Sequence, residues 1–238
     1  MAARTKVTEI VALAEKALID AVEEGDGFPE IDRELLKSLK SGYSDEDRAE
    51  LLNKFHHAIE NCTQCKLHTG RTKFVFGTGN PNADILFVGE GPGKEEDLTG
   101  EPFVGRAGKL LDKILDAIKL DRTMIYIANI VKCRPPNNRD PETDEMATCM
   151  PYLLKQIELI RPKLICCLGR VSAQALLETT KPLGKLRGEF HDFRGVKLCV
   201  TYHPAALLRN PQFKRGTWED VKMLRREYDR LRGVESEF

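Results

Sequence analysis

Four of the seven cysteines in this 238-residue chain are spaced as ligands of a metal centre. Cys62 and Cys65 form a C-x-x-C pair, and Cys133 and Cys149 follow with fifteen residues between them. A C-x-x-C loop lets two thiolates reach one metal centre with little backbone strain, and two further cysteines complete four ligands. Zinc and a 4Fe-4S cluster both accept four thiolates, so these residues predict a metal site without deciding which metal it holds.

The alternative function of a C-x-x-C pair is a redox couple, which normally opens a helix after a strand. Here the pair follows an acidic stretch with helical periodicity, and this context favours metal binding. The other three cysteines lie in apolar runs of strand length, where cysteine usually packs as a small apolar side chain. We therefore expect Cys166, Cys167 and Cys199 in the core.

A glycine-rich turn, Gly89-Glu90-Gly91-Pro92-Gly93, follows a predicted strand and could contact a ligand. It matches neither the dinucleotide-binding fingerprint nor the phosphate-binding P-loop. Lys94 and Glu95 stand where those motifs need a glycine and a serine or threonine. The segment predicts a sharp turn whose backbone N–H groups can approach a flat ligand or a phosphate.

Three single residues have side chains that could contribute to the same chemistry. Asn129 lies in an apolar strand, where a buried amide needs partners in a neighbouring loop or in a ligand. Phe103 lies in a loop, where its ring could be a platform for a planar ligand or an anchor for the loop itself. His203 precedes Pro204, and it could donate to a developing oxyanion or serve a structural role.

Strand and helix patterns alternate after residue 60, and they predict how these residues come together. Apolar runs of strand length and helical patterns alternate over 85–88, 105–119, 124–131, 141–160, 163–168, 170–178, 197–202 and 218–231. Strands joined by such long helical connections form a mostly parallel, four-stranded sheet with helices on both faces. Ligands bind beyond the carboxyl ends of such strands, so we expect the glycine-rich turn, Asn129 and His203 to meet at one rim.

Residues 1–60 differ from the rest of the chain in charge and pattern. Apolar residues recur at helical spacing over 7–22, and a second helical stretch that starts at Ser44 has one apolar face, formed by Leu51, Leu52, Phe55 and Ile59. We divide the chain into an acidic helical extension, 1–60, and an α/β domain, 61–238. The extension is expected to be solvated or to contact another protein, and the chain is expected to be a monomer.

The net charge of zero, from 37 basic and 37 acidic residues, would argue against a polyanionic partner. However, residues 1–60 carry 8 basic and 14 acidic residues, whereas residues 61–238 carry 29 and 23. Residues 181–232 around His203 carry 13 basic and 6 acidic residues, which predicts a surface that binds phosphates in a salt-sensitive way. No stretch approaches the roughly 18 apolar residues of a membrane span, and residues 1–17 lack a signal-peptide core, so a cytoplasmic protein is expected.

Taken together, these motifs resemble those of the family 4 uracil-DNA glycosylases of bacteria and archaea, which carry an iron–sulfur cluster. The resemblance spans about residues 61–231 and includes the cysteine spacing. Four motifs occur in order, namely Gly89–Gly93, Thr99–Gly105, Asn129–Pro136 and Tyr202–Pro211. It implies a three-layer α/β/α fold, a 4Fe-4S cluster at the four cysteines, and hydrolysis of the N-glycosidic bond of deoxyuridine in single- or double-stranded DNA, which leaves an abasic site.

The resemblance also implies roles for individual residues. Phe103 would stack on a flipped uracil, and Asn129 would accept from its N3–H and donate to its O4. His203, with backbone N–H groups of the turn Glu90–Gly93, would stabilise the charge that builds on the uracil ring. One of Leu207, Leu208 and Arg209 would enter the duplex to hold the flipped state.

One feature of the wider superfamily is missing from this sequence. Its best-known members have an Asp in the first motif to orient the water, and Gly91 stands at that position here, as in family 4. Glu90, and after it the run Glu95-Glu96-Asp97, are the candidates for this role, although that run could also be a solvated turn. His191 lies where another branch traps DNA covalently, but the basic insertion of that branch is not recognised here, so ordinary turnover is expected. The competing hypothesis is a non-catalytic nucleic-acid-binding protein in which a cluster or a zinc ion only holds loops together.

Overall fold

The computed structural model describes residues 47–238, and they form a six-stranded sheet with the order β1-β3-β2-β4-β6-β5. The four central strands are parallel and correspond to the four predicted runs, namely β2 (Ile85–Gly89), β3 (Ile125–Asn129), β4 (Leu164–Leu168) and β6 (Val196–Thr201). All residues of the first three are buried, which explains why they are continuous apolar runs. The mostly parallel sheet is therefore confirmed.

The predicted number of strands is wrong, because two short antiparallel strands extend the sheet at its edges. They are β1 (Thr78–Gly79), which pairs with β3, and β5 (Phe190–Phe193), which forms a hairpin with β6. β1 has only two residues, and three of the four residues of β5 keep some exposure to solvent. Edge strands of this kind lack the continuous apolar run by which the central strands were recognised.

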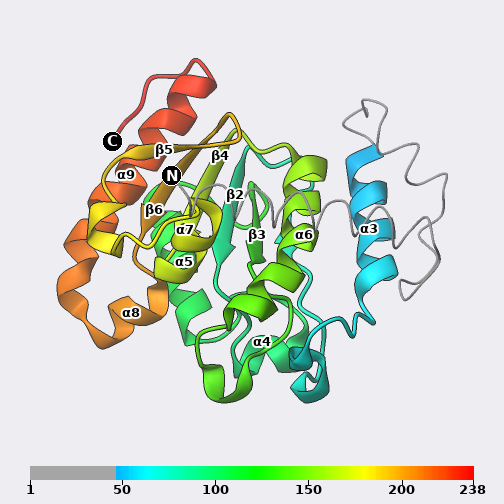
Figure 1. Ribbon diagram of the computed structural model, residues 1–238. Helices are drawn as coiled ribbons and strands as arrows, with labels where there is room; N and C mark the ends of the chain where they lie inside the picture. The colour runs from blue at the N-terminus through cyan, green and yellow to red at the C-terminus, as the bar shows by residue number, and fades with distance from the viewer. Residues whose placement is uncertain (1–46) are drawn as a thin grey trace.

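Helices cover both faces of the sheet, as Figure 1 shows, and this confirms the three-layer α/β/α arrangement. One face packs against α6 (Thr143–Ile160) and α7 (Arg170–Leu176), and the other packs against α5 (Arg106–Ala117) and α9 (Lys214–Leu231). Successive strand residues point to opposite faces, so that Leu86 and Val88 join the first core and Ile85 and Phe87 the second. No helix within residues 47–238 is long and apolar enough to cross a membrane.

The helix α3 (Asp47–Ile59) packs on the outer side of α6, at the right of Figure 1. Its four apolar residues Leu51, Leu52, Phe55 and Ile59 are buried, as the sequence pattern predicts. The predicted helix over 7–22 and the predicted start at Ser44 lie outside the described residues. The boundary at residue 60 stays a prediction.

Short helices and turns complete the fold around the carboxyl ends of the strands. They comprise α4 (Lys94–Thr99), α8 (Pro204–Arg209) and the 3-10 turns η1 (Lys66–Gly70), η2 (Pro136–Asn138), η3 (Leu183–Lys185) and η4 (Pro211–Phe213). Cys166, Cys167 and Cys199 are buried in β4 and β6, which confirms that they belong to the core.

Candidate active site

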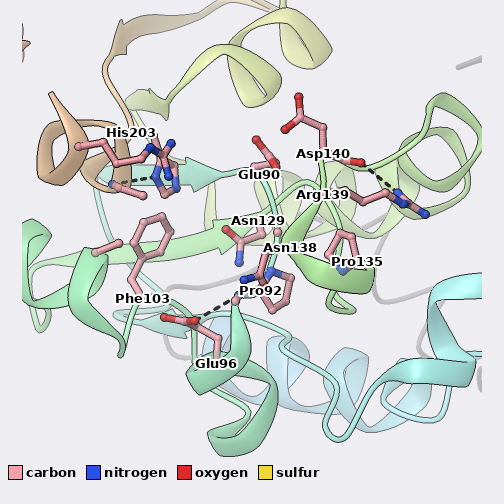
Figure 2. Close-up of a pocket in the computed structure, with 15 residues that line it drawn as sticks. Glu90, Pro92, Glu96, Phe103, Asn129, Pro135, Asn138, Arg139, Asp140 and His203 are labelled. Atoms are coloured by element: carbon pink, nitrogen blue, oxygen red, sulfur yellow. Dashed lines mark hydrogen bonds between the residues drawn. The ribbon is translucent and has the colours of Figure 1, made fainter.

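A pocket of about 320 Å³ lies at the carboxyl ends of the parallel strands. Figure 2 shows how side chains from the turn after β2, the loop before α5, the end of β3 and the start of α8 converge on it. The predicted substrate-binding residues that line it are Glu90, Gly91, Pro92, Gly93, Phe103, Asn129 and His203. The fold therefore brings together residues that are more than 100 positions apart in the sequence.

Asn129 ends β3 and lies opposite Gly89 of β2 in the parallel register. Its side chain is buried, and its Oδ1 has no hydrogen-bond partner within residues 47–238. A Cβ on Gly89 would lie 2.3 Å from Asn129 Oδ1 and 2.7 Å from the Phe103 ring, so a glycine is needed there. A buried acceptor without a partner costs about 1–3 kcal/mol, which a ligand that offers a donor would recover.

Phe103 holds its ring in the pocket through an unusual backbone conformation, with φ at 55°. Arg122 fixes this loop by donating to the carbonyl oxygen of Pro102 over 3.2 Å and to that of Phe103, and its Nε donates to Asp112 Oδ1 over 2.7 Å. The chain also passes so close to α5 that a Cβ on Gly108 would lie 1.6 Å from the carbonyl oxygen of Phe103. Neither Arg122 nor Gly108 was found from the sequence, because both act through tertiary contacts.

Glu96 joins the glycine-rich turn to the Phe103 loop. Its Oε2 accepts from the N–H of Gly93 over 3.1 Å, and its Oε1 accepts from the N–H groups of Val104 and Gly105 over 2.9 Å each. Asp97, next to it, is buried and accepts from the N–H of Thr72. The alternative interpretation of this run as a solvated turn is therefore wrong for these two carboxylates, which connect backbone segments. A role of the run in orienting the water stays a prediction.

His203 has the geometry of a neutral hydrogen-bond donor. Its Nδ1 accepts from the N–H of Ala205 over 3.1 Å, so the ring proton resides on Nε2. Burial, together with the nearby charge of Arg209, lowers the pKa of His203 to about 4, so that the ring is uncharged at neutral pH. The ring lies 5.4 Å from that of Phe103, centroid to centroid, on the same side of the pocket.

Glu90 and Asp140 present two carboxyl groups at one side of the pocket (Figure 2). Burial and the charge of Asp140 raise the pKa of Glu90 to about 7, although Arg170 and Arg209 act in the opposite direction. Asp140 itself pairs with Arg170 at the start of α7. Sequence reasoning missed Asp140, because it lies in a polar loop without a motif and is brought to the pocket by the fold.

The predicted duplex-contacting residues differ in exposure. Leu207 is only 2% exposed, whereas its neighbour Leu208 on α8 is 42% exposed. Arg209 lines the pocket. His191 lies on β5, where it bonds to the carbonyl oxygen of Leu186, and it does not line the pocket.

The four predicted metal-ligating cysteines each have a hydrogen-bonding group near the sulfur. Tyr152 OH lies 3.2 Å from Cys62 Sγ, and Arg71 Nη1 donates to Cys133 Sγ over 3.4 Å. Arg71 also donates to the carbonyl oxygen of Cys62, which connects the two segments.

Backbone N–H groups act on the other two sulfurs, those of Cys65 and Cys149. The N–H group of Leu67 acts to lower the pKa of Cys65, and that of Lys132 acts to lower the pKa of Cys149, but burial outweighs both. Burial is the largest of the effects that raise the pKa of Cys65 and of Cys133, and the charges of neighbouring cysteines add to it. The four thiols are thus close enough to interact electrostatically.

The four cysteines provide the donor types of a metal centre. Burial raises the pKa of the Cys149 thiol to about 12, so its thiolate needs a compensating cation at neutral pH. Hydrogen bonds to sulfur are typical of protein sites that stabilise iron–sulfur clusters. Within residues 47–238, however, no three His, Cys, Asp or Glu side chains converge as a compact site for a metal ion. The donor types, and not a preformed ligand geometry, therefore support a metal centre here.

The family model described as "Uracil DNA glycosylase superfamily" matches residues 76–222, which include the pocket and all the central strands. Among the relatives, the "Type-4 uracil-DNA glycosylase" of Archaeoglobus fulgidus is 45% identical over 184 residues, covering 74% of this chain and 92% of the relative. The protein of the same name from Saccharolobus solfataricus is 47% identical, covering 70% of this chain and 82% of the relative. That from Thermotoga maritima is 45% identical, covering 74% of this chain and 93% of the relative. The chain belongs to the type-4 uracil-DNA glycosylase family.

Proposed function

We propose that this protein is a DNA-repair glycosylase that flips uracil out of DNA, hydrolyses its N-glycosidic bond and leaves an abasic site. The observation that carries this proposal is the buried amide of Asn129, which lines the pocket and whose Oδ1 has no hydrogen-bond partner among residues 47–238. Membership of the type-4 family supports the same substrate.

Asn129 selects uracil by its pattern of donor and acceptor. Its Oδ1 accepts from uracil N3–H, and its Nδ2 donates to O4. Cytosine has an acceptor at N3 and a donor at the neighbouring exocyclic group, so both contacts would become repulsive or unpaired. Sites that recognise a group by hydrogen bonds reject an unmatched analogue by about 10⁴-fold or more. Phe103 stacks on the ring, which contributes about 1–3 kcal/mol.

His203 stabilises the leaving group. When the bond between C1′ and N1 breaks, its electron pair moves to the uracil ring and builds negative charge on O2, while the sugar becomes cationic. The neutral ring of His203 donates its Nε2–H to that oxygen. A preorganised donor of this kind lowers the activation barrier by about 2.7–4 kcal/mol. Water then forms the new bond to C1′ and releases a proton.

Glu90 is the group that we propose to orient this water and to accept its proton. The pKa of about 7 leaves a substantial fraction of this carboxyl ionised at neutral pH, which is the condition for a general base. Burial is the main cause that raises this pKa, and the nearby Asp140 raises it further, because two carboxylates in one partly buried site cannot both ionise easily.

The DNA backbone is held by the basic surface of residues 181–232, which carries 13 basic and 6 acidic residues. Leu208 is the exposed apolar residue beside Arg209 and enters the base stack to hold the flipped state. Leu207, in contrast, is buried on α8 and is not available for this contact.

The cofactor that we propose is a 4Fe-4S cluster, held by Cys62, Cys65, Cys133 and Cys149. When bound, it supplies the cationic charge that keeps four thiols ionised, and it ties together the segments that carry them. Arg71 and Tyr152 orient the ligands through the contacts to sulfur. The reaction on uracil uses only the residues of the pocket.

An oligonucleotide with one uracil, incubated with the protein and then treated with alkali, tests the activity directly. We expect strand scission at uracil and none in matched oligonucleotides with cytosine or thymine. The variant Asn129→Asp keeps an acceptor for N3–H but loses the donor to O4, and it should lower uracil release at least about 100-fold. A protein with its visible absorbance intact that binds the DNA but never cuts it would instead support the non-catalytic alternative.

A further inference from the structure

Asp220 is a buried carboxylate on α9 that binds the end of β6, close in the chain to His203. Its Oδ2 accepts from the hydroxyl group of Thr201 over 2.8 Å, and both Asp220 and Thr201 are only 1% exposed. Thr201 is the last residue of β6, and α8 begins at Pro204. The carboxylate therefore fixes the strand end from which the chain turns into the pocket.

Arg187 binds the same carboxylate from the segment after η3. Its Nε donates to Asp220 Oδ2 over 3.0 Å and its Nη2 donates to Asp220 Oδ1 over 2.9 Å, which is the two-point geometry of a strong ion pair. Nη2 also donates to the carbonyl oxygen of Gly216 on α9. A Cβ on Gly216 would lie 2.6 Å from Nη2, so α9 approaches the guanidinium group closely. The Arg187 side chain is 20% exposed, although it belongs to the basic segment 181–232.

The guanidinium group of Arg187 also contacts Tyr202, the residue between Thr201 and His203. It lies 4.9 Å from the centroid of the Tyr202 ring, within the range of a cation–π contact. The same ring stacks on Phe213, with the centroids 4.3 Å apart and the planes 4° from parallel. Both residues that precede His203 are therefore held by side chains from α9, from η4 and from the segment after η3.

We propose that Asp220 and Arg187 are positioning residues, which hold the ring of His203 where uracil release requires it. The inference rests on the role of His203 in the proposed function. Because His203 Nδ1 accepts from the N–H of Ala205, the ring follows the local backbone, and a displaced strand end would move the Nε2 donor with it. A misplacement of about 1 Å can lower a rate by about 100-fold. Neither Asp220 nor Arg187 lines the pocket, so both act through the two residues before His203.

A basic residue in this segment could instead bind a DNA phosphate, and the two roles of Arg187 predict different kinetics. Loss of a phosphate contact weakens substrate binding, so it raises KM and makes KM less sensitive to salt. Loss of a positioning residue removes an interaction that matters in the transition state, so it lowers kcat. The structure favours positioning, because the guanidinium group already donates to Asp220 and Gly216.

Substitutions at three positions and a matched control separate these contributions. Thr201→Val removes the hydrogen bond to Asp220 with little change in shape, and Thr201→Ser keeps it. Asp220→Asn removes the charge that Arg187 binds. Asp229→Asn is the control, because Asp229 is also buried on α9, at 2% exposure, and accepts from Arg225 Nε over 2.8 Å.

We expect Thr201→Val and Asp220→Asn to lower kcat for uracil release by about 10–100-fold in single-turnover kinetics, with little change in KM. Arg187→Met should show the same pattern, and Thr201→Ser should restore most of the rate. Asp229→Asn should lower the urea midpoint and leave kcat unchanged. An Arg187→Met variant with unchanged kcat, raised KM and a smaller salt dependence would assign Arg187 to the DNA surface and overturn its positioning role.

The His203→Ala background shows whether these residues act through His203. Without that ring, Thr201→Val and Asp220→Asn should lower kcat no further, because residues that act as a unit have non-additive effects. The same fold loss in both backgrounds would show a general structural role and overturn the inference. If Asp220→Asn does not accumulate, Thr201→Val carries the comparison. The proposed function fails separately, if the unchanged protein releases no uracil or if His203→Ala keeps full activity.

Discussion

Gly89 and Asn129 lie opposite each other at the carboxyl ends of two neighbouring parallel strands, with room for no more than a hydrogen atom on Gly89. The side chain of Asn129 and the ring of Phe103 both pack over this glycine. Two side chains that line the pocket, Asn129 and Phe103, can therefore take their positions only because Gly89 has no side chain. The consequences of filling this space are specific and measurable.

Gly89→Ala should displace the Asn129 amide and the Phe103 ring together. The added Cβ would lie 2.3 Å from Asn129 Oδ1, which forces a shift that costs about 1–3 kcal/mol of stability. We expect kcat/KM for uracil release to fall by about 100-fold or more, because misplacement of about 1 Å has effects of this size. Gly184→Ala is the control, since nothing lies within 4 Å of a Cβ there. Full activity of a folded Gly89→Ala variant would show that the close packing is not needed.

His203→Ala should lower kcat much more than it raises KM. The proposed bond from Nε2 forms to charge that develops only as the glycosidic bond breaks, so its loss should cost about 2.7–4 kcal/mol, or roughly 100–1000-fold in kcat. Single-turnover kinetics on a uracil oligonucleotide would measure this step. Since the pKa of His203 is about 4, its protonation should not limit the activity of the unchanged protein above pH 5. An activity loss that follows a group with a pKa near 6.5 and disappears in His203→Ala would contradict the neutral ring.

Glu90 should control the pH dependence of both activity and stability. If its carboxylate accepts the proton of water, kcat should rise as the pH increases through about 7, and Glu90→Gln should be slow and lack this rise. Folding raises the pKa from 4.5, so the native state binds the proton more tightly than the unfolded one. This contribution to stability is complete below pH 4.5 and is lost as the pH rises through about 7.

Urea titrations between pH 4 and pH 8 would measure this loss as the difference between the unchanged protein and Glu90→Gln. The two curves should converge at the acid end and separate toward pH 8, with the Gln variant the more stable. Parallel curves would mean that folding leaves the pKa of Glu90 unshifted.

Leu208→Ala should weaken activity on duplex DNA and leave activity on single strands nearly unchanged. A wedge is needed only where a base must leave a stacked duplex, because unstacking and unpairing the base cost a few kcal/mol. The cost is smaller in a single strand, so the wedge matters less there. Leu98→Ala is a suitable control, because Leu98 is similarly exposed, at 48% against 42%, and does not line the pocket. The ratio of the rates on matched single- and double-stranded uracil substrates is the measurement. An unchanged ratio would assign the wedge to another residue.

Much of the fold could be predicted, because its central strands and covering helices are recognisable from local patterns. The four parallel strands were found as buried apolar runs, and the carboxyl ends of these strands pointed to the rim where the pocket lies. The edge strands β1 and β5 were missed, since a strand that pairs on one side and meets solvent needs no continuous apolar run.

The candidate site was found only where its residues belong to motifs. Asn129, Phe103 and His203 were predicted, and all three line the pocket. Arg122 was not predicted, and Glu96 was named only as a candidate for orienting the water. Both connect loops through hydrogen bonds to backbone groups, and an arginine or a glutamate has no sequence signature for this role.

The sequence by itself determined the central sheet, the types of residue that could bind uracil or a metal, and the opposite charges of the two parts of the chain. Only the tertiary structure decided that Gly89 makes room for Asn129, that Asp140 joins Glu90, and that Glu96 connects the glycine-rich turn to the Phe103 loop. The physical reason is that periodicity and turn chemistry act over a few residues. Burial, a shifted pKa and close packing depend on neighbours that are distant in the chain, and these exist only once the strands have found their register.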